Sequence, residues 1–232
     1  MDVATAVALF RAETNDTVST AYLWSDVEVY AFLDDAQKMF CRLTGGLSDS
    51  TSAITTVACT AGAEFVSVSP KILRLKSVEN RVDGYRCQIL NYEDMAAQSA
   101  VPDYGYVAVS GIDSSTGPIR AVVTGMEPNK IRLIRIPEAN QDLRLVVNRL
   151  PLIDINVTTV GNSTAVLEID EMHHRHLLLW MKALAHMKQD AEVFNQGKAM
   201  EFDAQFRQYC DQAKSDLERR EHKYRTVAYG GL

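Results

Sequence analysis

The order of its segments constrains the fold of this chain more than any single motif does. Strong helical signals cover Ser25–Thr44 and Asp170–Arg220, and about a hundred residues of short, strand-like segments separate them. A chain that leaves a set of packed helices, builds a β-domain and then returns to the helices contains an inserted domain. We therefore expect an α+β fold: N-terminal helices and two C-terminal helices form a helical bundle, and the middle of the chain forms an antiparallel β-sandwich or barrel-like domain.

The expected domain boundaries follow these changes of pattern. Residues 1–48 and 165–218 are assigned to the helical bundle, and residues 49–164 to the inserted β-domain. Residues 219–232 are assigned to an extended C-terminal arm, because the residues after Lys223 cannot sustain a helix.

The N-terminal half of the predicted bundle has specific start and stop signals. A short helix is expected over Asp2–Glu13. The next helix begins with a capping box, in which the Ser25 hydroxyl accepts a hydrogen bond from the Glu28 amide and the Glu28 carboxylate reaches back. The pair Gly45-Gly46 supplies a left-handed stop. Apolar residues at helical spacing predict one buried face between these signals: Val29, Phe32, Leu33, Ala36, Met39, Phe40 and Leu43.

The middle of the chain is rich in β-branched and aromatic residues that alternate between turns. Five early strands are expected, over Ser52–Cys59, Glu64–Val68, Ile72–Val78, Arg86–Tyr92 and Tyr106–Ser110. Three later segments are clearer, namely Pro118–Thr124, Lys130–Ile136 and Leu143–Leu150. Because their links are too short for a parallel crossover, these three are predicted to be successive antiparallel strands.

The helical period returns near Asp170, which is predicted to cap the next helix. Its apolar stripe consists of Leu177, Trp180, Met181, Leu184 and Met187. A turn or kink is expected over Asp190–Gly197, and a second helix carries Met200, Phe206, Tyr209, Cys210, Ala213 and Leu217.

The charge balance does not favour DNA as the main ligand. The chain has 24 basic and 30 acidic residues, a net charge of −6, whereas phosphate neutralisation needs clustered positive charge. An acidic protein can still line a passage through which DNA slides. Four arginines on the later strands could form a basic face, but a charged outer face of an antiparallel sheet is the simpler interpretation: Arg132, Arg135, Arg144 and Arg149.

The remaining motifs do not assemble a catalytic or metal site. His173, His174 and His176 were considered as metal ligands. A zinc-binding helix normally pairs histidines at i and i+4, as in HExxH, and takes a third ligand from nearby, and this sequence has neither feature. Gly197-Lys198 lacks the rest of a phosphate loop, and Gly111–Gly117 lacks a nucleophile elbow. The four cysteines form no CxxC pair, and the start of the chain has no signal-peptide pattern. We expect no enzyme activity, no cofactor, no metal and no membrane segment, in a protein made in the cytoplasm.

The C-terminal end is basic in an acidic chain. From residue 219 onward the chain has one acidic residue, Glu221, and four basic residues, which gives a local charge of 4 − 1 = +3. The basic residues are Arg219, Arg220, Lys223 and Arg225. Such asymmetry is typical of an interaction tail. The alternative is an ordinary helix end, where cations complement the helix dipole.

Several stretches, in this order, resemble tailed-bacteriophage head-to-tail adaptor (connector) proteins. They are Trp24–Glu28, Phe32–Gln37, Cys41–Thr44, Gly117-Pro118, Ile131–Pro137, Leu145–Pro151, Leu167–Asp170 and Ala199–Cys210. The resemblance covers most of the chain. It implies a structural virion protein at the head–tail junction, in a ring of about twelve copies, a dodecamer, that joins the portal to the tail.

The resemblance also implies the partners of such a ring. These are the portal protein, a tail tube or nozzle protein that meets the β-domain loops, other copies of the chain, and genomic DNA that passes without sequence recognition. The residues that the resemblance assigns to portal binding lie in the arm: Arg219, Arg220, Lys223, Tyr224, Arg225, Tyr229 and Leu232. Two alternatives stay open at this point, another neck or tail-completion protein and a nucleic-acid-binding module.

Overall fold

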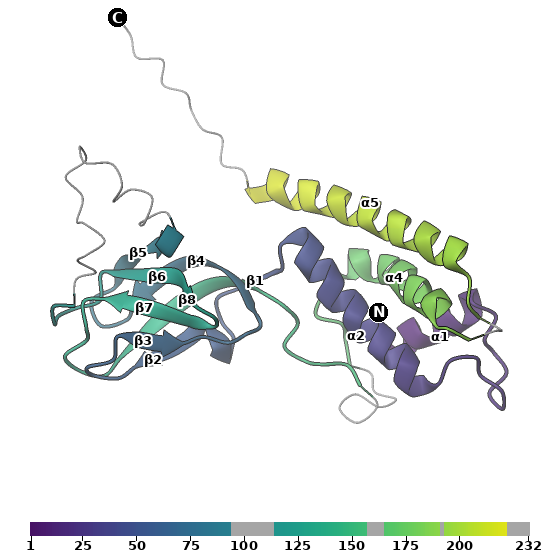
Figure 1. Ribbon diagram of the computed structural model, residues 1–232, viewed down its shortest axis with the longest axis horizontal. Coiled ribbons are helices and arrows are strands. Elements are labelled where there is room, and N and C mark those ends of the chain that lie inside the picture. The colour runs from purple at the N-terminus through teal and green to yellow at the C-terminus, as the bar shows by residue number, and fades with distance from the viewer. Residues whose placement is uncertain (94–113, 157–164, 191–192, 222–232) are drawn as a thin grey trace, which may run out of the picture. The chain divides into compact units, whose positions relative to one another are not determined.

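The computed structural model describes residues 1–93, 114–156, 165–190 and 193–221 (Figure 1). It divides into two compact units. The helical unit comprises Met1–Gly46 and Pro151–Leu232, and the strand unit comprises Leu47–Leu150. The predicted α+β class is therefore confirmed.

Four α-helices lie in the described part of the helical unit: α1 (Val3–Glu13), α2 (Asp26–Thr44), α4 (His174–Met187) and α5 (Gln196–Glu221). A short 3-10 turn, Glu171–His173, leads directly into α4. Helix α4 contacts each of the other three, and α2 also packs on α5 (Figure 1). None of the helices in the described ranges is long and apolar enough to cross a lipid bilayer.

The predicted capping of α2 is confirmed. The Ser25 side chain and the Glu28 side chain each bond the other's backbone, as a capping box requires. Gly45 ends the helix in the left-handed region, with φ 95°. The face that turns inward carries the buried residues Val29, Leu33, Ala36 and Phe40.

The C-terminal helices differ from the sequence expectation at their ends. Helix α4 stops at Met187 and α5 starts at Gln196, which confirms the predicted turn. Met187 and Met200 are exposed instead of buried, because both lie at helix ends beyond the packed faces, and Ala199 is buried in place of Met200. Asp170 precedes the helical segment, but its side chain makes no capping hydrogen bond to it.

The strand unit is one curled sheet of eight strands. Its strands are β1 (Leu47–Asp49), β2 (Thr56–Cys59), β3 (Phe65–Ser67), β4 (Ile72–Asn80), β5 (Tyr85–Asn91), β6 (Ala121–Glu127), β7 (Lys130–Ile134) and β8 (Gln141–Arg149). The order along the sheet is β1-β8-β4-β5-β6-β7-β3, and β2 also pairs with β8. Because β2 and β3 contact each other, the sheet curls toward closure around its core. That core consists of Val57, Cys59, Val78, Cys87, Ile119, Val122, Ile131, Leu133, Leu143, Leu145 and Val147.

Two expectations about strand pairing are wrong. Strands β5 and β6 are parallel, which the long connection over residues 92–120 permits. Strand β8 does not pair with β7, although only a short link joins them. In that link Arg135 has φ 66°, and Pro137 O and Asn140 Oδ1 accept hydrogen bonds from Gly62 N and Ala61 N. These bonds direct the chain across to β2, so that β8 starts a different part of the sheet.

Two further expectations concern individual segments. The segment Ser52–Cys59 is a strand only from Thr56, because residues Ala53–Thr55 form a 3-10 turn. The expected strand Tyr106–Ser110 lies outside the described residues.

Candidate interaction surfaces

The end of α5 carries the first two of the residues predicted to bind a portal. Helix α5 continues through Arg219 and Arg220 to Glu221, and both arginines are exposed. Arg219 lies 3.3 Å from Asp216, one turn earlier, and its side chain is 80% exposed. The last buried residue of the helix is Ala213, Leu217 one turn later is half-buried, and the described side chains after Leu217 are exposed. The other predicted residues lie outside the described ranges: Lys223, Tyr224, Arg225, Tyr229 and Leu232.

The histidines considered as metal ligands pack between helices. His173 Nδ1 lies 2.7 Å from the Tyr209 hydroxyl on α5, and His174 Nε2 lies 2.6 Å from Ile169 O. The His176 ring stacks on the Tyr209 ring with centroids 3.4 Å apart. Within the described ranges, no group of three His, Cys, Asp or Glu side chains could hold a metal ion. The arrangement fixes α5 against α4.

Burial makes this packing sensitive to acid. It lowers the pKa of His173 and of His176 below the usual 6.5, because the charged ring loses solvation. The unfolded chain then binds more protons than the folded chain, so this contribution to stability is complete above pH 6.5 and is lost as the pH falls below it.

We expect replacement of both histidines by phenylalanine to weaken this pH dependence. The free energy of unfolding of the wild type should fall between about pH 7.5 and about pH 5.5, and that of the double variant should fall less. Urea unfolding monitored by tryptophan fluorescence measures it, since Trp24 and Trp180 are the two tryptophans of the chain and both lie in the helical unit. An unchanged pH slope in the variant would contradict the assignment.

The acidic residues Asp34, Asp35 and Glu168 of the helical unit have structural partners. Asp34 Oδ2 lies 2.6 Å from Lys38 Nζ, and Asp35 Oδ2 accepts a 2.7 Å hydrogen bond from Trp180 Nε1. Glu168 accepts hydrogen bonds from the backbone amides of residues 152 and 153.

The pair Gly197-Lys198, considered as part of a phosphate loop, lies at the start of α5. The Asn195 side chain caps this helix by accepting a hydrogen bond from the Lys198 amide, so the pair belongs to a helix start.

The four arginines of the later strands do not form one basic face. Arg132 lies on β7, whereas Arg144 and Arg149 lie on β8, and these strands are not neighbours. Arg149 Nε lies 2.5 Å from Asp49 Oδ2, and Arg132 lies 3.5 Å from Glu64. The prediction that they line neighbouring strands is wrong, because it assumed that β7 and β8 pair.

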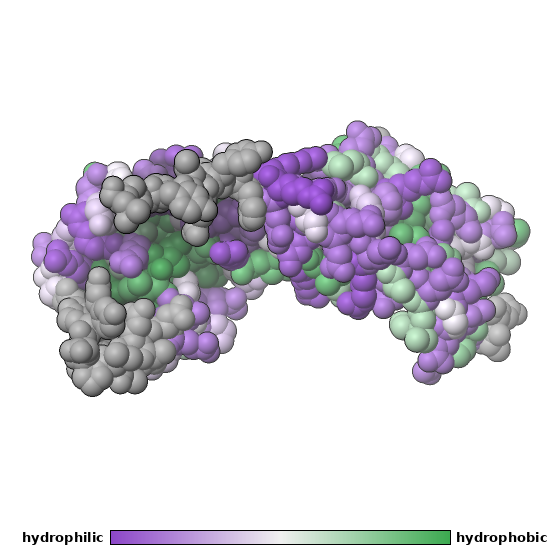
Figure 2. Space-filling model, turned by 90° about the horizontal axis from the view of Figure 1, so that it is seen from above, coloured by the Kyte–Doolittle hydropathy of each residue, from purple (hydrophilic) through white to green (hydrophobic). Residues whose placement is uncertain are grey.

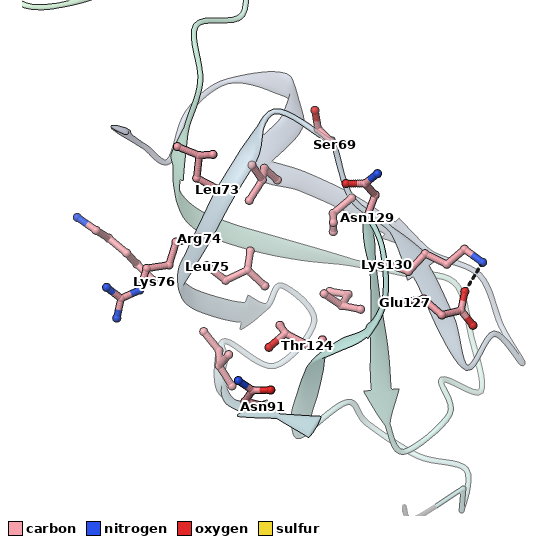
Figure 3. Close-up of a pocket in the computed structure, with 15 residues that line it drawn as sticks. Ser69, Leu73, Arg74, Leu75, Lys76, Asn91, Thr124, Glu127, Asn129 and Lys130 are labelled. Atoms are coloured by element: carbon pink, nitrogen blue, oxygen red, sulfur yellow. Dashed lines mark hydrogen bonds and ion pairs between the residues drawn. The ribbon is translucent and has the colours of Figure 1, made fainter. Parts of the chain in front are cut away.

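Sequence reasoning missed a hollow in the strand unit. Its volume is about 670 Å³, and it lies between β4 and the β6–β7 hairpin (Figure 3). Hydrophobic residues gather on one face of the strand unit in Figure 2. The sequence predicted a strand over Ile72–Val78, but the hollow depends on where the pairing of β5 with β4 stops, at Val78–Asn80.

Comparison with known proteins agrees with the segment order described above. The family described as SU10 adaptor protein matches residues 1–228. No curated protein matches the chain. Since the match covers nearly all of both units, the chain belongs to the SU10 adaptor protein family, a family of bacteriophage head-to-tail adaptors.

Proposed function

We propose that this protein is a structural virion component that forms a ring of about twelve copies and joins the portal to the tail. The observation that carries the proposal is the family match over residues 1–228. In this arrangement the ring continues the DNA channel, and DNA passes through it without sequence recognition. The net charge of −6 supports such a passage, because repulsion keeps the polymer from adhering.

The proposal assigns the parts of the chain as follows. The helical bundle, residues 1–48 and 165–218, carries the arm, and the inserted β-domain, residues 49–164, presents loops to a tail tube or nozzle protein. The arm, residues 219–232, binds the portal. The exposed basic end of α5 supports this role, since Arg219 and Arg220 follow the last half-buried residue of the helix, Leu217, and both are exposed. An arm that orders on its partner stays soluble when free.

Deleting Thr226–Leu232 is expected to leave the fold intact and to weaken attachment to the portal protein of the same virus. Sedimentation of the purified chain, alone and mixed with that portal protein, measures the attachment. The control is a chain in which the same residues are shuffled, because it keeps length and charge but not the order of side chains. Circular dichroism of the deletion variant establishes that it is folded.

Three results would contradict the proposal. Unchanged co-sedimentation of the deletion variant would show that the end of the arm does not contribute to portal binding. No co-sedimentation of the full-length chain, with both proteins folded, would favour another neck or tail-completion protein. Salt-sensitive retention of DNA by the isolated chain would favour a nucleic-acid-binding module.

A further inference from the structure

The hairpin that joins β4 to β5 presents apolar and basic side chains at its tip, residues 81–86. Val82 is 72% exposed, more than any other large hydrophobic side chain among the described residues. Tyr85 is exposed as well, and Arg81 and Arg86 are the first and last residues of the tip. Tyrosine and arginine are enriched where proteins bind proteins, and an exposed valine beside them adds apolar contact area.

Hydrogen bonds and an ion pair fix the conformation of this hairpin tip. Asn80 is fully buried and its Oδ1 accepts a hydrogen bond from Val82 N, while Asp83 Oδ1 accepts one from Tyr85 N. Arg120 lies 3.0 Å from the Asp83 carboxylate, and its guanidinium lies 4.3 Å from the centre of the Tyr85 ring. A preorganised tip loses little conformational entropy when it binds.

The charges of the hairpin tip favour a protein over a nucleic acid as its partner. Arg81 and Arg86 are exposed, and neither makes an ion pair with a residue that the structure describes. Arg86 lies opposite Glu79 on β4, so a phosphate backbone would meet a carboxylate there. A protein surface that combines apolar and acidic side chains fits both the exposed valine and the arginines.

A second exposed surface, the apolar end, lies on the helical unit where α2 and α5 begin and α4 ends (Figure 1). Glu28 of α2 lies 2.8 Å from Lys188, the residue after α4, so the start of α2 lies beside the α4–α5 turn. Exposed apolar clusters mark interaction sites, and methionines adapt to the shape of a partner. Four side chains of the apolar end are more than half exposed: Val27, Met187, Phe194 and Met200.

The apolar end is also acidic. Residues 26–28 and 187–201 contain two basic and five acidic residues, a net charge of 2 − 5 = −3. The whole helical unit without the arm, residues 1–46 and 151–218, has a net charge of 9 − 18 = −9, whereas residues 47–150 have 11 basic and 11 acidic residues. The basic hairpin tip of one copy is therefore attracted to the acidic helical unit of another copy.

The position of the apolar end points to a second copy of the chain and away from the portal. Helix α5 has 26 residues and is therefore about 39 Å long, and the proposed portal-binding arm follows its other end. Because the hairpin tip and the apolar end are different surfaces, a contact between them repeats from copy to copy. Such a heterologous contact builds a ring when the rotation between copies closes.

We propose that the hairpin tip of one copy binds the apolar end of the next copy. Val82 and Tyr85 pack on the exposed apolar side chains, and the two arginines of the tip lie near the acidic residues around them. The inference rests on the proposed function, because it assigns this contact to neighbouring copies in the ring.

Two variants and their mixture test the contact. The tip variant, Arg81→Glu with Val82→Asp, and the apolar-end variant, Met187→Lys with Met200→Lys, change exposed side chains, so both should keep the wild-type circular dichroism. In sedimentation velocity we expect the wild type to self-associate and each variant alone to associate about tenfold more weakly. An equimolar mixture should form dimers and nothing larger, because the intact tip of one variant can bind only the intact apolar end of the other.

Matched controls change the same kinds of side chain elsewhere. Leu73→Asp with Arg74→Glu alters exposed residues at the other end of β4, and Val166→Lys with Met172→Lys alters exposed residues elsewhere on the helical unit. Neither control should change self-association. A wild type that stays monomeric up to about 1 mM, or a mixture that associates no better than the separate variants, would overturn the proposal.

Co-sedimentation with the portal protein separates this inference from the adaptor role. Fewer copies of the tip variant than of the wild type on the portal would support both statements. Self-association as expected, without any attachment to the portal, would contradict only the adaptor role. The same number of copies of the tip variant and of the wild type on the portal would overturn only the contact proposed here. Binding of the tip to a tail protein, lost in the tip variant while self-association is kept, would also overturn it.

Discussion

Replacing Arg11 by methionine is expected to lower the free energy of unfolding of the helical unit by about 3–5 kcal/mol. The Arg11 side chain is 8% exposed and the Asp16 side chain 1%, and Arg11 Nη1 lies 2.5 Å from Asp16 Oδ2. Methionine fills much of the same volume, so the loss arises mainly because the Asp16 carboxylate remains buried without its cation.

Arg11 also contacts the segment that precedes α2 and the first residue of that helix. Its second terminal nitrogen lies 2.6 Å from Asp26 Oδ1, and both terminal nitrogens donate to Trp24 O at 3.2 Å. The guanidinium lies 3.6 Å from the centre of the Tyr22 ring. Because Trp24 Nε1 donates to Ala185 O at the end of α4, the network also fixes α1 and α2 relative to α4.

Urea unfolding followed by tryptophan fluorescence measures this loss. Arg42→Met is the matched control, since Arg42 is exposed on α2 and should change stability by less than about 0.5 kcal/mol. Combining Arg11→Met with Asp16→Asn should recover part of the loss, because the amide needs no cation and can still accept from Leu23 N. A single variant as stable as the control would show that Asp16 does not depend on Arg11.

Local signals explain which parts of the fold could be predicted. The capping box at Ser25, the left-handed stop at Gly45 and the apolar stripe through Leu33 act within a few residues, and the structure has all three. The buried face of α5 at Phe206 and Cys210 follows from the same short-range periodicity.

The parts that could not be predicted depend on contacts between distant segments. Nothing in the sequence near β8 indicates that it pairs with β4 and β2 instead of β7; that choice is made by bonds such as Gly62 N to Pro137 O. The hollow arises from where the β4–β5 pairing stops, which is a property of sheet curvature. The Arg11 network joins residues that no periodic pattern groups, although an arginine on the buried face of a short helix is a signal that sequence reading can use.

Replacing Phe206 by alanine is expected to cost about 3–5 kcal/mol and to loosen α5 from the helical unit. Phe206 is fully buried, and its ring lies 5.3 Å from that of Trp180 on α4. Trp180 in turn donates its indole N–H to Asp35 on α2, so the removed ring contacts the point where three helices meet. Most residues of α5 are exposed and polar or charged, and therefore few other apolar side chains hold it in place.

Hydrogen exchange resolves where this loss acts. Amides of α5 should exchange faster in Phe206→Ala, while those of the strand unit should keep their wild-type protection, because the two units have separate cores. Gln208→Ala, an exposed change on the same helix, should alter neither. If α5 carries the portal-binding arm as proposed, Phe206→Ala should also weaken co-sedimentation with the portal protein, even though Arg219, Arg220 and all later residues are unchanged. Wild-type attachment with a loosened α5 would mean that the arm binds as an independent segment, without needing the helix to position it.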